Sequence, residues 1–257
     1  MPIAGAVEWS RTAVAAYVVL CSAGAIGVLG AVAVVTNEPF IFPSLGPTAF
    51  MLFYAGMAAA TCPRTVITGH LIGVLSAVLG LVVFGLVGIM WAIEVIDTVV
   101  LGRSLNAIGI HPRDIGRAWQ IPLAPFLHGD FGHLISNTGP LLWLGAMVSV
   151  WGVGEFLLVT AGITVFGGAG TWLIGRDAVH QGGSLLALGF FGYLVARGAV
   201  ERRVIAVALA ILTVYWYGYA AWSVLPGVPR VSWESHLSGM LAGAAMGYLV
   251  RGRPRIE

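Results

Sequence analysis

Charged residues are scarce in this chain. Only 9% of its 257 residues are Asp, Glu, Lys or Arg, whereas about a quarter are charged in ordinary soluble domains. Hydrophobic residues make up 58% of the chain and occur in long unbroken runs. The short alternating strands of a membrane barrel do not match such runs. The sequence therefore predicts an all-α, polytopic membrane protein.

Lysine is absent, and Cys21 and Cys62 are the only cysteines. Two cysteines give neither the spacing of a metal site nor a disulfide framework, so we expect two free thiols, no metal and no cofactor. The net charge of +2 comes from arginines scattered among the loops. This distribution provides no basic surface and excludes nucleic acid as an expected partner.

Hydropathy predicts eight membrane-spanning helices. The first apolar run lacks a cleavage site after a short core, so we expect it to remain as a helix. The third run would be about 50 Å long as one helix, against a hydrocarbon core of about 30 Å. The predicted spans are 12–35, 47–61, 69–101, 130–150, 154–174, 182–199, 203–224 and 234–250.

The arginines predict one orientation in a membrane that we expect to be a prokaryotic cell membrane. Under the positive-inside rule, those that follow the sixth and eighth spans make both of these ends cytoplasmic. If 69–101 is a single tilted or kinked helix, Arg11 and Arg64 also lie inside; if it is two helices, they lie outside. We therefore expect one long third helix and two cytoplasmic termini. The arginines that follow the sixth and eighth spans are Arg197, Arg202, Arg203, Arg251, Arg253 and Arg255.

Polar residues gather at the external ends of three spans. His128, His133 and Asn137 lie at the head of the fourth span, Ser184 at the head of the sixth and His236 at the head of the eighth. The predicted topology places all of them at one depth on one face. Such residues can be interhelical hydrogen-bonding groups, but polar side chains within a membrane indicate a functional site by default.

Ser184 and His236 are the minimal pair for acyl transfer. A serine hydroxyl becomes a nucleophile when an imidazole takes its proton. The attack places negative charge on the former carbonyl oxygen, and preorganised donors stabilise that charge. We expect these donors to be His133 and Asn137, four residues apart on one helical face, with the Ser184 backbone N–H. His128 lies before the helix and is expected to support the site or its water.

Glycines flank both members of the pair. Gly182 and Gly183 precede Ser184, while Gly239 and Gly243 form a Gly-x3-Gly strip in the eighth span. Small residues let two helices approach closely, so we expect this strip to bring the eighth helix against the sixth. Ordinary helix packing would use the same glycines.

Several motifs between about residues 87 and 250 carry a family resemblance. They are Met90-Trp-Ala-Ile-Glu-Val-Ile-Asp97, Gly109-Ile-His-Pro-Arg113, Ala124-Pro-Phe-Leu-His128, His128-x4-His133-x3-Asn137, Gly182-Gly-Ser184 and His236-x2-Gly239-x3-Gly243. Together they resemble the rhomboid family of intramembrane serine proteases. The resemblance implies a six-helix core, a site opening to the external side, a Ser–His dyad without an aspartate, and transmembrane protein substrates in the bilayer.

Two positions depart from the family pattern. Leu185 replaces the glycine expected after the serine, and Leu188 replaces the aromatic residue commonly found four residues after it. Leu185 would add bulk where the substrate carbonyl approaches, and losing the ring would loosen the imidazole. An inactive protein that only binds transmembrane segments is therefore an alternative, although every group of the proposed chemistry is present.

The N-terminal part resembles a second family. Pro43-Ser-Leu-Gly-Pro-Thr-Ala-Phe50 and the segment 62–70 are similar to the early part of the HPP membrane proteins, over about 12–83. We expect a transmembrane hairpin over 1–83 and a protease domain over 84–257. A small-anion transport site around Pro43–Pro47 is the functional alternative for the hairpin.

The remaining polar residues are expected to have structural roles. Glu94 and Asp97 share one face near the end of the third span, and His180 belongs to an external loop. The apolar loop 102–129 is expected to lie in the membrane interface and brace the site. The connection 225–234 is expected to be mobile and to cover the site.

Overall fold

The computed structural model describes residues 65–227 and 231–251, with side chains from Leu81 onward. Several parts of the chain that carry predictions lie outside the described residues. They are the first two predicted spans, both cysteines, the segment Pro43–Pro47 and both chain termini. The chain divides into two compact units, Met1–Val78 and Leu79–Glu257, and the second contains every candidate site residue.

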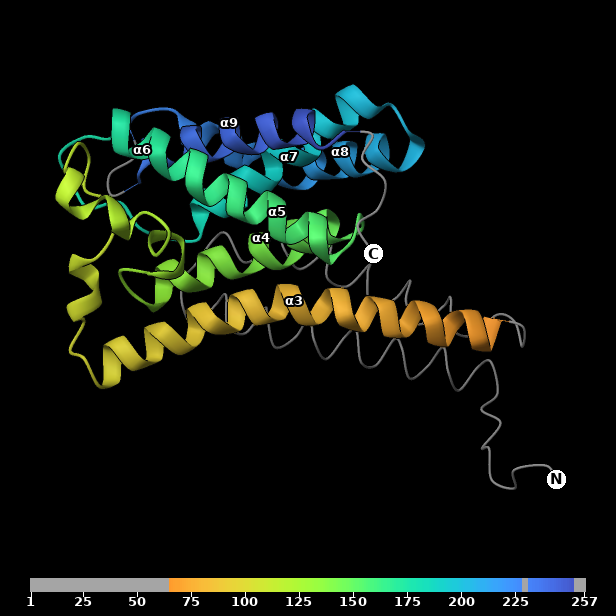
Figure 1. Ribbon diagram of the computed structural model, residues 1–257, viewed down its shortest axis with the longest axis horizontal. Coiled ribbons are helices and arrows are strands. Elements are labelled where there is room, and N and C mark those ends of the chain that lie inside the picture. The colour runs from red at the N-terminus through yellow and green to blue at the C-terminus, as the bar shows by residue number, and fades with distance from the viewer. Residues whose placement is uncertain (1–64, 228–230, 252–257) are drawn as a thin grey trace, which may run out of the picture. The chain divides into compact units, whose positions relative to one another are not determined.

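Seven α-helices make up most of the described residues, and no strand occurs among them. The third predicted span is one uninterrupted helix, and each later span is helical as expected. A π-helical turn, η4 (Ile163–Gly167), joins α5 to α6, and a 3-10 helix, η5 (Gly218–Val224), continues α8. The α-helices are α3 (Thr65–Val99), α4 (Phe131–Ser149), α5 (Val153–Gly162), α6 (Gly168–Ile174), α7 (Ser184–Glu201), α8 (Val204–Tyr217) and α9 (Trp233–Leu249) (Figure 1).

Four helical segments of the described chain are long and apolar enough to cross a membrane. They are Leu81–Val99, Val153–Ile174, Ser184–Glu201 and Val204–Val224. The prediction of an all-helical membrane protein is thus confirmed for the described residues, while the count of eight spans extends beyond them. Many of the exposed side chains on these segments are large and apolar, such as Val204 and Ile211. Such outward faces suit contact with lipid.

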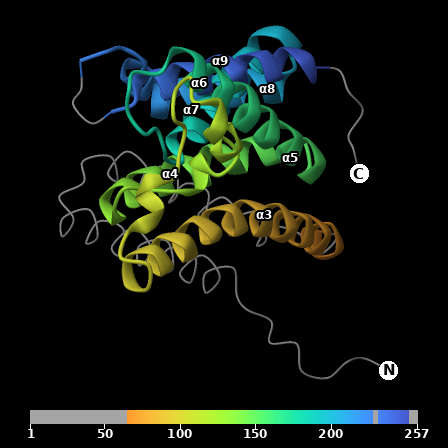
Figure 2. The same ribbon diagram turned by 60° about the vertical axis from the view of Figure 1, so that its left-hand side comes forward.

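Helix α7 is the centre of the second unit. It packs against α4, α5, α8 and α9, and Figure 2 shows it beneath α6 and α9. About two-thirds of its span (67%) is buried, against 39% or less in the other three spanning segments. Ser184 therefore begins the most enclosed helix of the described chain.

The α7–α9 contact depends on glycine, as the Gly-x3-Gly strip predicts. A Cβ atom at Gly239 would overlap the backbone carbonyl oxygen of Leu185, and one at Gly243 would overlap that of Gly189. Backbone therefore lies directly on backbone along this seam. The close approach sets the start of α9 beside the start of α7.

The loop between α3 and α4 contains three short 3-10 helices, η1 (Ser104–Ala107), η2 (Ile115–Gln120) and η3 (Ala124–Phe126). Ile110 and His180 form an isolated antiparallel bridge, with N–H to carbonyl distances of 2.8 and 3.0 Å. The Ala124 carbonyl also accepts from the N–H of Gly182 at 3.0 Å. The loop therefore holds the segment that leads into α7.

Arg197 is not a loop arginine, which corrects one premise of the predicted topology. It lies within α7 and is 2% exposed. Its guanidinium pairs with Glu155 of α5 and, at 2.7 Å, with Glu201, and it stacks over the ring of Trp151 at 4.3 Å. Because these partners compensate its charge, Arg197 can be buried and need not face the cytoplasm.

The acidic pair near the end of α3 has structural partners, as expected. The Asp97 carboxylate accepts from the backbone N–H of Leu105 at 3.0 Å. The hydroxyl of Thr98 donates to Glu94 at 3.3 Å. The first bond ties the helix end to the loop that follows it, and the second lies within α3.

Candidate active site

Ser184 is the first residue of α7 and follows a turn that requires glycine. Gly182 has φ 127°, a backbone conformation that residues other than glycine rarely adopt. A Cβ atom there would lie 2.5 Å from Cε1 and 2.7 Å from Nε2 of His133. The imidazole of His133 therefore lies against the turn that presents Ser184.

His128 fixes this turn from the other side. The backbone N–H of Gly183 donates to its Nε2 at 3.1 Å, so Nε2 carries no proton and the ring is neutral. Burial, and secondarily the charge that His133 can carry, lowers the pKa of His128 to about 3. The two rings meet edge to face with centroids 5.1 Å apart. His128 thus contacts the residue before Ser184.

Asn137 provides an unused donor. Asp130 caps α4 by accepting from the N–H of His133 at 2.8 Å, which starts the helix that carries both residues. Asn137 lies one turn further on and is buried, and its Nδ2 has no hydrogen-bond partner among the described residues. An unpaired buried donor costs roughly 1–3 kcal/mol, so it is expected where a ligand completes it.

His236 lies in the first turn of α9. Its Nδ1 is 2.8 Å from Oγ of Ser223 in η5, and its ring is close enough to His133 for the two to interact electrostatically. Within the described chain no hydrogen bond joins Ser184 to His236; such catalytic contacts are often long before substrate binds. Ser184, His133 and His236 are all partly exposed, so the group is open to a reactant.

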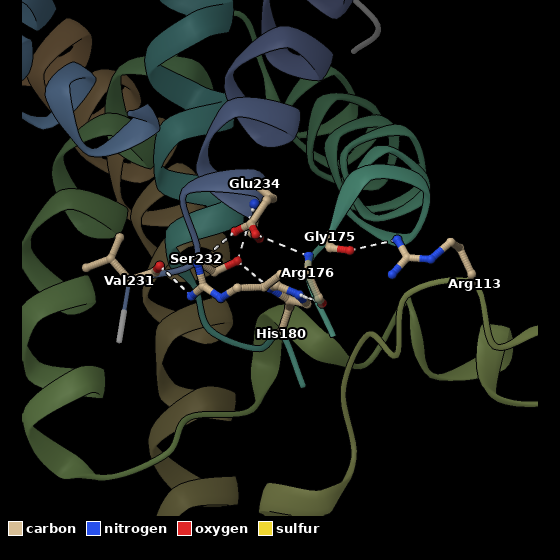
Figure 3. A network of polar contacts seen from close by, with 8 residues as sticks. Arg113, Gly175, Arg176, His180, Val231, Ser232 and Glu234 are labelled. Atoms are coloured by element: carbon tan, nitrogen blue, oxygen red, sulfur yellow. Dashed lines mark hydrogen bonds and ion pairs between the residues drawn. The ribbon is translucent and has the colours of Figure 1, made fainter. Parts of the chain in front are cut away.

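A polar network holds the start of α9 (Figure 3). Arg176, in the loop between α6 and α7, donates through its backbone N–H to Glu234 at 3.1 Å and through its guanidinium to the Val231 carbonyl at 2.8 Å. Glu234 is 1% exposed and also forms an ion pair with Arg176. Arg113 adds a bond to the Gly175 carbonyl at 2.7 Å. Three loops are therefore tied together beside His236.

His180 belongs to this network, and the sequence reasoning missed its role. It is buried, its Nε2 lies 3.1 Å from the Arg176 carbonyl, and its Nδ1 lies 2.5 Å from Oγ of Ser232. Since a carbonyl only accepts, Nε2 carries a proton. Burial lowers the pKa of His180. Ser232 in turn caps α9 by accepting from the N–H of Ser235 at 3.3 Å, so His180 links the start of α9 to the segment before α7.

Leu185 and Leu188 do not line the opening of the site. Leu185 is 1% exposed, and its side chain packs close to Gly167 and Gly239. Leu188 is likewise buried in the apolar core. The expectation that Leu185 crowds the substrate carbonyl is therefore wrong, because the neighbouring glycines make room for its side chain. Leu188 gives the imidazole of His236 no aromatic surface.

A metal site has no support in the described chain, where no group of three or more His, Cys, Asp or Glu side chains could hold an ion. What the residues offer is a serine at a glycine turn, a nearby imidazole on a second helix, and an imidazole and a free amide on a third. This set suits nucleophilic acyl transfer.

Two family models match the chain. The model of the Rhomboid domain matches residues 116–253, which include every candidate site residue. The model of the HPP transmembrane region matches residues 5–108, which extends beyond the expected limit of residue 83.

Relatives occur in bacteria. An uncharacterised protein of Mycobacterium tuberculosis is 34% identical over 185 residues, which cover 68% of this chain and 77% of the relative. An uncharacterised protein of Mycobacterium leprae is 32% identical over 68% of this chain and 73% of its own length. YdcA of Bacillus subtilis, described as a candidate rhomboid protease, is 26% identical over 52% of this chain and 68% of its own length.

Proposed function

Since the chain belongs to the rhomboid family, we propose that it is an intramembrane serine protease that hydrolyses peptide bonds in or near the transmembrane segments of other membrane proteins. One observation carries the proposal. The starts of α7 and α9 and the first turns of α4 converge on the glycine turn before Ser184, where His133 touches Gly182 and His128 binds Gly183.

In the proposed reaction, Ser184 is the nucleophile and His236 is the base. Oγ of Ser184 attacks the carbonyl carbon of the scissile bond while Nε2 of His236 takes its proton. The carbon–nitrogen bond then breaks, and His236 returns the proton to the leaving amine. A water molecule, deprotonated by the same imidazole, hydrolyses the acyl-enzyme and regenerates Ser184.

Asn137, His133 and the Ser184 N–H are the proposed oxyanion donors. The free Nδ2 of Asn137 supports this role, because a group buried without a partner needs no rearrangement before it stabilises the developing charge. His128 holds the Gly183 N–H and is therefore assigned to support the turn. Gly182, Gly183, Gly239 and Gly243 keep the three helices close enough for these groups to act together.

Orientation and domain limits remain part of the proposal. We place the site on the external side and both termini in the cytoplasm, with a hairpin over 1–83 and the protease domain over 84–257. Without Arg197, the bias over the full sequence is seven arginines on the expected cytoplasmic side against five on the external side. The seven are at positions 11, 64, 202, 203, 251, 253 and 255, and the five are at 103, 113, 117, 176 and 230. The HPP transmembrane region matches residues 5–108, and small-anion transport by the N-terminal part is kept as a second candidate function.

Cleavage of a reporter transmembrane protein in reconstituted vesicles tests the proposal. Replacing Ser184→Ala should lower the cleavage rate by at least about 10⁴-fold, as expected when a nucleophile is removed, while thermal unfolding stays unchanged. Ser149→Ala is the matched control, because the Ser149 hydroxyl bonds only the Ala146 carbonyl of its own helix. A wild-type protein that binds the reporter without cleaving it would establish the inactive alternative.

A further inference from the structure

We propose that Ser223 is a positioning residue and acts as the third member of the group formed by Ser184 and His236. It fixes the tautomer and the orientation of the His236 imidazole. This inference rests on the proposed function. Oγ of Ser223 lies 2.8 Å from Nδ1 of His236, although the two residues come from different elements, η5 and α9.

The bonds of Ser223 determine which ring nitrogen carries the proton. Oγ of Ser223 lies 2.6 Å from the Ala220 carbonyl, and a carbonyl can only accept, so the single hydroxyl hydrogen is used in that bond. The oxygen can then only accept from His236. Nδ1 of His236 is therefore the protonated nitrogen, and Nε2 has the free lone pair that a base needs.

Ser223 does what a carboxylate does in a complete triad, but without a charge. A base is held in its productive tautomer when a third group bonds its far nitrogen. The nearest acid on α9 is Glu234, two residues before His236 and thus on a different helical face. Glu234 is also engaged by Arg176 at 3.4 Å. The Ser223 hydroxyl lies within hydrogen-bond distance of His236, and the backbone of the same residue also hydrogen-bonds the imidazole, so Ser223 is the residue that holds the ring.

Leu188 makes this bond more important. An aliphatic side chain offers the imidazole no stacking surface, so hydrogen bonding must orient the ring. Ser223 lies in η5, the 3-10 continuation of α8, so the position of this short helix sets the position of the base. A shift of η5 away from α9 would release the ring without changing Ser184 or the oxyanion donors.

The tautomer can be measured directly. In protein labelled with ¹⁵N-histidine at neutral pH, the His236 signals, assigned by their loss in His236→Gln, should show a protonated Nδ1 and an unprotonated Nε2. In Ser223→Ala the signals should shift towards a mixture of tautomers, whereas Ser223→Thr, which keeps the hydroxyl, should retain the original pattern. A protonated Nε2 in the wild type would overturn the inference.

Kinetics provide the second measurement. Ser223→Ala should lower kcat by about tenfold with little change in KM, the effect of one neutral hydrogen bond, and Ser223→Thr should restore most of it. Ser223→Ala with wild-type kcat and an unchanged tautomer would also overturn the inference. The NMR signals do not require turnover, so a wild-type protein that cleaves nothing but shows the expected tautomer would contradict the proposed function and leave the positioning bond intact.

Discussion

The two ends of α7 both bury polar groups, but these groups are paired at one end and partly unpaired at the other. At the far end, Arg197 bonds Glu155, Glu201 and the hydroxyl of Tyr193, so each charge has a partner. At the end that begins with Ser184, two buried polar atoms have no partner in the described structure. They are Nδ2 of Asn137 and Oε1 of Gln181.

This difference separates structure from function. A buried charge that is fully paired holds helices together. Removing that charge leaves its buried partner without compensation, which destabilises the fold. A buried donor without a partner weakens the fold, and use by a ligand or transition state is one reason for its presence. The far end should therefore respond to mutation by unfolding, and the Ser184 end by losing activity.

The largest expected effect is at the far end. Replacing Arg197→Met leaves Glu155 buried without its cation and should lower the free energy of unfolding by about 3–5 kcal/mol. Arg203→Met is the control, because Arg203 is exposed and its 3.2 Å pair with Glu201 should be worth about 0–1 kcal/mol. Denaturation midpoints in one detergent measure both. Equal midpoints for the two variants would contradict a structural role for the buried network.

Asn137→Ala should produce the opposite pattern. Removing an oxyanion donor should raise the activation free energy by about 2.7–4 kcal/mol, or roughly 10²–10³-fold in kcat, while stability stays level or rises, since an unpaired buried group is lost. Ser136→Ala, in the same turn but bonded to its own helix at 2.8 Å, should change neither quantity. An unstable but active Asn137→Ala variant would remove Asn137 from the site.

A mutation in the seam between α7 and α9 should lower both the stability and the activity of the protein. Gly243→Ala places a methyl group on the Gly189 carbonyl and should cost about 1–3 kcal/mol of stability through overpacking, and it should also reduce the cleavage rate by moving His236. Gly85→Ala is the control, because its Cβ would meet nothing within 4 Å. If Gly243→Ala is as stable and active as Gly85→Ala, the seam does not position the base.

Acidification should act on the Ser184 end. The folded-state pKa of His128 is about 3, below the value of roughly 6.5 in the unfolded chain, so its contribution to stability is present above pH 6.5 and is lost as the pH falls towards 3. Between pH 7 and 5 the loss should be about 2 kcal/mol. His128→Gln, which keeps an acceptor for Gly183, should reduce this slope, and Ser149→Ala, which removes no titratable group, should not. Equal slopes in all three proteins would show that His128 is not held neutral.

The features that the sequence predicted correctly are those that a local pattern of residues determines. Long apolar runs specify helices, and α3 to α9 lie close to the predicted spans. The spacing of His133 and Asn137 correctly placed both side chains in the first turns of one helix. The glycines of α9 predicted a close helix contact because only small residues allow it.

The contacts of the loops could not be predicted in this way. His180 meets Ser232 and Ser223 meets His236 only after distant segments fold together, and no periodicity marks such pairs. Leu185 follows Ser184 directly, but successive residues of a helix point about 100° apart, so its side chain enters the core. Leu185→Gly is therefore expected to destabilise the protein and not to raise its turnover.

Labelling by a fluorophosphonate probe in native membranes tests the central claim most directly. The account predicts that the wild-type protein is labelled at Ser184, that Ser184→Ala is not labelled, and that Ser149→Ala is labelled as well as the wild type. Labelling of Ser184→Ala at the wild-type level, or a folded wild-type protein that takes up no label, would contradict the assignment of Ser184 as an activated nucleophile.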